Sequence, residues 1–176
     1  MSSVAATEVR PRTLVVGLGN PVLGDDGVGW KILDTLEWLL ASDARVGRSV
    51  GQVEVDRLSV GGLSLMERLV GYDRAILADA VLDGGPAGRV RVTTLPELAS
   101  GTAGHLDSAH DTTLSSALAM GRALGAQLPR ELAVVTVSAE RVSDFDETMT
   151  PAVEAAVEEA VWRIVELLRG PAKGGA

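Results

Sequence analysis

The stretch that decides the fold spans residues 14–29 and reads LVVGLGNPVLGDDGVG. Its first five residues form a continuous apolar run rich in valine, which is typical of a strand covered on both faces. Glycines, an asparagine and a proline follow, and over residues 28–41 apolar side chains recur every three or four positions, as on one face of a helix. The stretch therefore predicts a strand, a glycine-rich turn and a helix, the basic unit of an α/β fold.

The rest of the chain continues this alternation. Further strands are predicted at residues 53–55, 74–81, 89–94 and 131–137, and further helices at 63–70, at 112–124 and from Pro151 onward. Thr150 and Pro151 mark the start of the last helix, as a threonine cap followed by a proline in the first helical position. The predicted fold class is α/β, a three-layer α/β/α sandwich with a mostly parallel sheet and one antiparallel edge strand.

The antiparallel strand is expected at residues 89–94, where polar and apolar residues alternate. A period of two with one wet face is typical of a half-exposed edge strand. Only a short link containing glycine and proline separates it from the strand at residues 74–81. We therefore expect these two strands to pair as a hairpin.

Length and composition limit the class of protein. A chain of 176 residues without a composition break predicts one domain over residues 1–176, with flexible tails at 1–12 and 170–176. The formal net charge of -8 argues against nucleic acid and anionic membranes as partners. The absence of cysteine excludes disulfides, thiolate zinc sites, iron–sulfur clusters and a cysteine nucleophile. Without a signal peptide or a spanning apolar segment, a cytoplasmic location is expected.

Ligands of open α/β sheets bind at the carboxyl ends of the strands. Asp25 and Asp26 stand there, at the expected start of the first helix, where they would repel the pyrophosphate that a glycine-rich dinucleotide loop binds. Either aspartate could instead cap the helix. Asp79 stands inside the apolar run 74–81, where a carboxylate is costly to bury unless it is paired, hydrogen-bonded or bound to metal. Its alternative role is to fix the following loop through backbone N–H groups.

The chain has two histidines, His105 and His110. His110 directly precedes a predicted helix, whereas His105 lies further out in a loop of small residues and is expected to be solvated. A histidine at a helix start is also a common surface residue, and this alternative stays open for His110. If its imidazole meets two carboxylates, one from the first loop and that of Asp79, the oxygen and nitrogen donors suit a borderline divalent ion such as Ni²⁺ or Zn²⁺. One coordination position is then left open.

A family resemblance is carried by several segments in order along nearly the whole chain. They are GLGNP at 17–21 with GDDGVG at 24–29, Asp79-Ala80 at the end of its strand, Ser108-Ala109-His110 before a helix, and the strand at 132–137 with the helix after TMTP at 148–151. Together they are similar to the nickel–iron hydrogenase maturation endopeptidases. The resemblance implies a protease that removes a short C-terminal extension from the precursor of a hydrogenase large subunit once nickel has been inserted.

The resemblance also implies the residues of the site. Members of the family carry an acidic residue in the first motif, an aspartate after the central strand and a histidine before the later helix as metal-binding residues; these map to Asp26, Asp79 and His110. We expect the nickel to arrive on the precursor, Zn²⁺ or Cd²⁺ to substitute for it in vitro, and no organic cofactor. The loop residues expected to contact the substrate are Gly19, Asn20, Asp25 and Gly27. No catalytic residue is assigned apart from the metal site, because the metal or a carboxylate could activate the water.

Two other functions remain compatible with the residues. One is a nucleotide-binding α/β enzyme that uses the loop at residues 17–29, which nucleotide would stabilise and Ni²⁺ or Cd²⁺ would not. The other is a non-catalytic chaperone that binds the hydrogenase precursor without trimming it. The chain also departs from the family pattern at Thr113, where many members have glycine; this change affects the local turn and leaves the three expected ligands in place.

Overall fold

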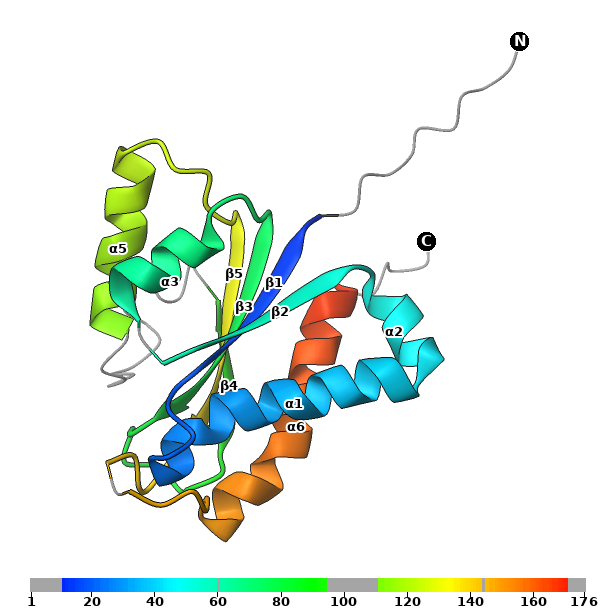
Figure 1. Ribbon diagram of the computed structural model, residues 1–176, viewed down its shortest axis with the longest axis vertical. Helices are drawn as coiled ribbons and strands as arrows, with labels where there is room; N and C mark the ends of the chain where they lie inside the picture. Colours follow the sequence, from blue (N-terminus) through cyan, green and yellow to red (C-terminus); the bar gives the residue numbers. More distant parts are fainter. Residues whose placement is uncertain (1–10, 60, 95–110, 144, 171–176) are drawn as a thin grey trace.

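The computed structural model describes residues 11–59, 61–94, 111–143 and 145–170, and these include a five-stranded sheet (Figure 1). The strands lie in the order β2-β1-β3-β5-β4, and every neighbouring pair is parallel except β4 with β5. Their bounds are Thr13–Leu18 for β1, Val53–Leu58 for β2, Arg74–Val81 for β3, Val90–Thr94 for β4 and Glu131–Ser138 for β5. The predicted mostly parallel sheet with one antiparallel edge strand is confirmed.

Helices cover both faces of this sheet (Figure 1). They are the 3₁₀ helix η1 at Gly24–Gly27, α1 at Val28–Ser42, α2 at Ala44–Val50, α3 at Gly62–Leu69, α5 at Asp111–Ala123 and α6 at Pro151–Arg169. Helices α1 and α6 pack on one face with α2 beside them, and α3 and α5 pack on the other. Along β3, Ile76 and Ala78 contact the α1–α6 layer, whereas Ala75 and Leu77 contact the α3–α5 layer. The continuous apolar runs of the sequence are thus strands buried on both faces.

The expected hairpin between β3 and β4 is wrong. Strand β4 pairs antiparallel with β5, and β5 lies between β3 and β4. The run of β5 is buried at every position from Leu132 to Ser138, so it belongs inside the sheet rather than at its edge. The gap that it fills is two strand spacings, about 10 Å. Residues 82–89 bridge this gap easily, because eight residues reach roughly 26 Å when extended.

The first turn of α1 rests directly on the backbone of β1 and β3. A Cβ atom at Gly29 would lie 2.2 Å from the carbonyl oxygen of Leu18 and 2.5 Å from that of Ala78. Likewise, a Cβ at Gly17 would lie 2.5 Å from the carbonyl oxygen of Gly29. The glycines of the opening motif therefore allow a close helix–sheet approach, which places the start of α1 at the carboxyl ends of the two central strands.

The ends of the described chain are held by the fold. Arg12, at the boundary of the expected N-terminal tail, lies over the ring of Tyr72 at 4.8 Å from its centroid, and its Nη1 donates to the carbonyl of Gly71 at 3.2 Å. At the other end, α6 continues to Arg169. Residues 1–10 and 171–176, which make up most of the predicted tails, lie outside the described residues. None of the described helices is long and apolar enough to cross a membrane.

Candidate functional site

The loop after β1 folds into η1, which contacts the carboxyl end of β3. Asp25 and Asp26 both lie in this 3₁₀ turn, which ends at Gly27 directly before α1 begins at Val28. The sequence predicted the two aspartates at the helix start but not the separate turn. Because η1 reaches β3, the loop of the first strand and Asp79 of the third are brought to the same edge of the sheet.

Asp25 is fully buried and binds the segment that leads into α6. Its carboxylate accepts hydrogen bonds from the backbone N–H groups of Glu140 at 3.0 Å, Arg141 at 3.1 Å and Thr150 at 2.6 Å, and from Thr150 Oγ1 at 3.1 Å. Burial acts to raise the pKa of Asp25, but the backbone hydrogen bonds from Thr150, Glu140 and Arg141 outweigh it and lower the pKa. The structure therefore gives this carboxylate a role inside the fold, at the start of α6 rather than as a cap of α1.

Asp26 is partly exposed, and the preceding loop wraps around it. Its Oδ2 accepts a hydrogen bond from the backbone N–H of Asn20 at 2.6 Å. Gly19 has a φ of +117° and lies so close that a Cβ there would be 1.8 Å from the carbonyl oxygen of Asp26. Gly27 makes a similar approach, since its Cβ would lie 2.7 Å from Cα of Pro21. Gly19, Asn20 and Gly27, expected to line a substrate loop, thus form the backbone frame of Asp26.

Asp79 lies near the carboxyl end of β3, where only 3% of its surface is exposed. Its Oδ1 accepts a hydrogen bond from the N–H of Ala80 at 2.9 Å. Since Ala75 and Leu77 point to the α3–α5 layer and side chains alternate along a strand, Asp79 points to the same layer. This is the local contact proposed as the alternative for Asp79.

Thr136 is a polar neighbour of Asp79 that the sequence analysis missed. It is the register partner of Asp79 in β5, it is 2% exposed, and its hydroxyl has no hydrogen-bond partner within the described part of the chain. An unsatisfied buried hydroxyl costs about 1–3 kcal/mol. A water or a polar ligand atom beside Asp79 would remove that cost. The register between β3 and β5 would have pointed to Thr136. Once Arg74 is paired with Glu131, the residues five positions later, Asp79 and Thr136, are also paired.

Both histidines, His105 and His110, lie outside the described residues. His110 directly precedes Asp111, the first residue of α5. Figure 1 shows that α5 ends near the start of β5, so its first turn is directed toward the carboxyl ends of the strands. Among the described residues, which contain neither histidine, no group of three His, Cys, Asp or Glu side chains could hold a metal ion. The structure thus brings together the elements that carry Asp26 and Asp79.

Comparison with models of protein families shows to which family the chain belongs. The family model of HycI, hydrogenase maturation protease, matches residues 47–167, which is more than half of the chain. The chain belongs to the hydrogenase maturation protease family. The protease is accordingly a peptidase, and its family acts in the maturation of hydrogenases. Neither a nucleotide-binding enzyme nor a non-catalytic chaperone, the two alternatives considered from the sequence, is supported by this membership.

Relatives of the protease cover most of its length. It is 28% identical over 160 residues to the hydrogenase 2 maturation protease of Escherichia coli, which covers 90% of this chain and 91% of that one. It is 25% identical over 160 residues to the hydrogenase expression/formation protein HupD of Thiocapsa roseopersicina, over 90% of this chain and 68% of the relative. The solved structure of the hydrogenase maturating endopeptidase HybD from E. coli has a TM-score of 0.72 at 26% identity, covering 90% of the protease and 92% of HybD.

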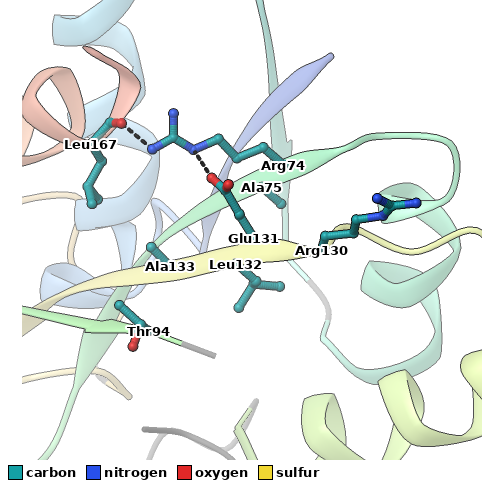
Figure 2. Close-up of a pocket in the computed structure, with 8 residues that line it drawn as sticks. All are labelled: Arg74, Ala75, Thr94, Arg130, Glu131, Leu132, Ala133 and Leu167. Carbon is teal, nitrogen blue, oxygen red and sulfur yellow. Dashed lines mark hydrogen bonds and ion pairs between the residues drawn. The ribbon is translucent and has the colours of Figure 1, made fainter. Parts of the chain in front are cut away.

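A cavity of about 270 Å³ lies at the opposite end of the sheet of the protease, near the starts of β3 and β5 (Figure 2). Its described lining contains neither aspartate nor histidine. Figure 2 shows the guanidinium of Arg74 between Leu167 and Glu131. It donates a hydrogen bond to the carbonyl of Leu167 and forms an ion pair with the carboxylate of Glu131. Arg74 Nη1 also donates to the carbonyl of Leu168 at 3.3 Å. The cavity is therefore a place where the sheet holds the end of α6, remote from Asp26 and Asp79.

We expect the substitution Arg74→Met to lower the free energy of unfolding of the protease by about 1–3 kcal/mol, because it removes charged hydrogen bonds to the last carbonyls of α6. Equilibrium urea denaturation measures this difference. The matched control is Glu131→Gln, which changes a side chain that is 75% exposed and should have little effect. Equal stability of Arg74→Met and the parent protease would contradict the anchoring role.

Proposed function

We propose that this protease removes the C-terminal extension from the large-subunit precursor of a nickel–iron hydrogenase after nickel insertion, and that Asp26, Asp79 and His110 recognise the nickel carried by the precursor. The observation that carries the proposal is the contact of η1 with β3. It brings a carboxylate from the first motif to the edge of the sheet where Asp79 lies. Family membership supplies the class of substrate and the class of reaction.

The chemistry of the donors supports nickel as the recognised ion. The chain contains no cysteine, so thiolate ligands are excluded, and carboxylates with imidazole suit Ni²⁺ and also Zn²⁺ or Cd²⁺ as stand-ins. Three protein donors leave coordination positions for groups of the precursor. The unsatisfied hydroxyl of Thr136 beside Asp79 adds a polar position for water or for a peptide group. These features fit a site that is completed by its substrate.

Two chemical routes are open to the residues at this edge. A nickel ion held between precursor and protease can polarise the scissile carbonyl or activate the attacking water. A carboxylate that is not bound to the ion can accept the proton of that water. No organic cofactor enters either route. The cytoplasmic location expected from the sequence stays a prediction.

The test of this function is cleavage of a defined precursor. The protease is mixed with a nickel-loaded large-subunit precursor and with the same precursor prepared without nickel, and the mass of the large subunit is followed over time. We expect the subunit to lose its C-terminal extension only when nickel is present. Equal cleavage of both forms would contradict nickel recognition, and an intact nickel-loaded precursor would contradict the proposed substrate.

A further inference from the structure

The chain has one phenylalanine, Phe145, and 91% of its surface is exposed. Val22, in the loop before η1, is 38% exposed. The two residues lie on backbone segments that are joined to each other. The N–H of Asp146 donates to the carbonyl of Val22 at 3.2 Å, and Leu23 and Asp146 form a parallel β-bridge. We call Phe145 and Val22 together the apolar rim.

The backbone under the apolar rim is fixed from both sides. Asp146 accepts a hydrogen bond from the N–H of Thr148 at 2.8 Å and forms an ion pair with Arg141 at 3.3 Å, while its carbonyl accepts from the N–H of Gly24 at 2.5 Å. The buried carboxylate of Asp25 binds the same segment through Arg141 and Thr150. These hydrogen bonds and the ion pair restrain the backbone next to Phe145, so its exposed side chain is carried by an ordered segment.

The apolar rim is continuous with the loop that holds Asp26. The N–H of Val22 donates to Asn20 Oδ1 at 3.2 Å, and the N–H of Asn20 donates to the carboxylate of Asp26 at 2.6 Å. A short chain of hydrogen bonds thus links the rim to the carboxylate proposed to recognise nickel. Single exposed apolar side chains are common on protein surfaces. What distinguishes Phe145 is this restrained backbone and its continuity with the site.

We propose that the apolar rim docks an apolar side chain from the C-terminal segment of the hydrogenase precursor. The proposal rests on the proposed function, because that segment must lie across the edge of the sheet at Asp26 and Asp79 to be cut there. Val22 and Phe145 lie on the two backbone segments that are hydrogen-bonded to the loop around Asp26, so a polypeptide held at Asp26 could reach them. Burial of an aromatic side chain is a strong, non-directional source of affinity. The rim binds the substrate and takes no part in the bond that is broken.

The test is the substitution Phe145→Ser, assayed by cleavage of the nickel-loaded precursor. The KM for the precursor should rise about 10-fold while kcat stays unchanged, because uniform binding is lost without a change at the reacting atoms. Phe145→Leu, which keeps an apolar side chain, should restore most of the affinity. The matched control is Trp38→Ser in α1, where a side chain that is 69% exposed lies several turns away from the site. It should leave KM unchanged.

The outcomes separate this inference from the proposed function. If the parent protease cuts the nickel-loaded precursor and Phe145→Ser has the same KM, the apolar rim is not a docking surface, although the function stands. If Phe145→Ser lowers kcat at unchanged KM, the role is not docking, and the inference is also overturned. If the parent protease does not cut that precursor, the proposed function itself fails. A melting temperature of Phe145→Ser equal to that of the parent confirms that folding is intact.

Discussion

The substitution Asp25→Ala is expected to lower the free energy of unfolding by about 3–5 kcal/mol, a large part of the 5–15 kcal/mol typical of a domain. The reason is that it leaves the N–H groups of Glu140, Arg141 and Thr150 without their acceptor inside the fold. Each unsatisfied buried donor costs about 1–3 kcal/mol, partly recovered if water enters. Chemical denaturation followed by circular dichroism measures the loss.

A second aspartate provides a matched control for Asp25. Asp43 also accepts backbone N–H groups, those of Arg45 and Val46 at the start of α2, but its side chain is 38% exposed. Asp43→Ala should therefore cost about 1 kcal/mol, as other exposed helix caps do. Equal losses of stability in the two variants would contradict the claim that burial makes the hydrogen bonds of Asp25 more important than those of Asp43.

The effect of Asp25 should also depend on pH. Because the pKa of Asp25 is lowered in the folded state, its contribution to stability is fully present above the unfolded-state pKa of about 3.9 and is lost as the pH falls through the lower folded-state pKa. The stability difference between the parent and Asp25→Asn should accordingly be constant above about pH 5 and shrink below about pH 4. A stability difference that grows as the pH falls would mean that folding raises the pKa of Asp25 instead of lowering it.

The substitution Asp79→Asn should reduce cleavage of the nickel-loaded precursor by about 100-fold or more, because loss of a carboxylate proposed to hold the nickel would misplace the precursor at the site of cleavage. Asparagine has the same shape and can still accept the hydrogen bond from Ala80, so the fold should be retained. His110→Ala should have an effect of similar size. Single-turnover cleavage assays with excess protease measure both rates without interference from weak binding.

Asp83 is the control for Asp79, because it is another buried carboxylate near the same end of β3. Its side chain is 4% exposed and forms ion pairs with Arg89 at 2.7 Å and Arg91 at 3.2 Å. Asp83→Asn should lower stability while leaving cleavage of the precursor largely intact. Full activity of Asp79→Asn, or equal loss of activity in both variants, would remove the argument for a special role of Asp79.

The layers of the fold follow from local patterns in the sequence. Apolar runs such as residues 74–81 have no wet face, so they predict strands with helices on both sides, and this is what β3 shows. The pairing of β4 could not be read in the same way. Its partner β5 lies about 40 residues later in the chain, and the short link to β3 suggested a hairpin. Local patterns contain the type of each element but not the order in which strands join the sheet.

In the candidate site, too, local sequence patterns predict some residues, whereas others depend on contacts between distant segments. Asp26 and Asp79 could be predicted at one edge because Asp26 follows β1 and Asp79 lies near the carboxyl end of β3, and the carboxyl ends of parallel strands meet. The partners of Asp25 could not, since Glu140 and Thr150 lie more than 110 positions away and no motif links them to η1. Thr136 was hidden for a related reason, because only the register of β5 against β3 places it beside Asp79.

The contact at Gly29 has a consequence for how the sequence can diverge. Helix α1 rests on the carbonyl oxygens of Leu18 and Ala78, and every amino acid carries such an oxygen. This part of the contact between helix and sheet therefore does not depend on which side chains occupy positions 18 and 78, and HybD has a similar fold at 26% identity. The glycines at positions 17 and 29 are the exceptions, because one added methyl group at either position would push the start of α1 away from β1 and β3.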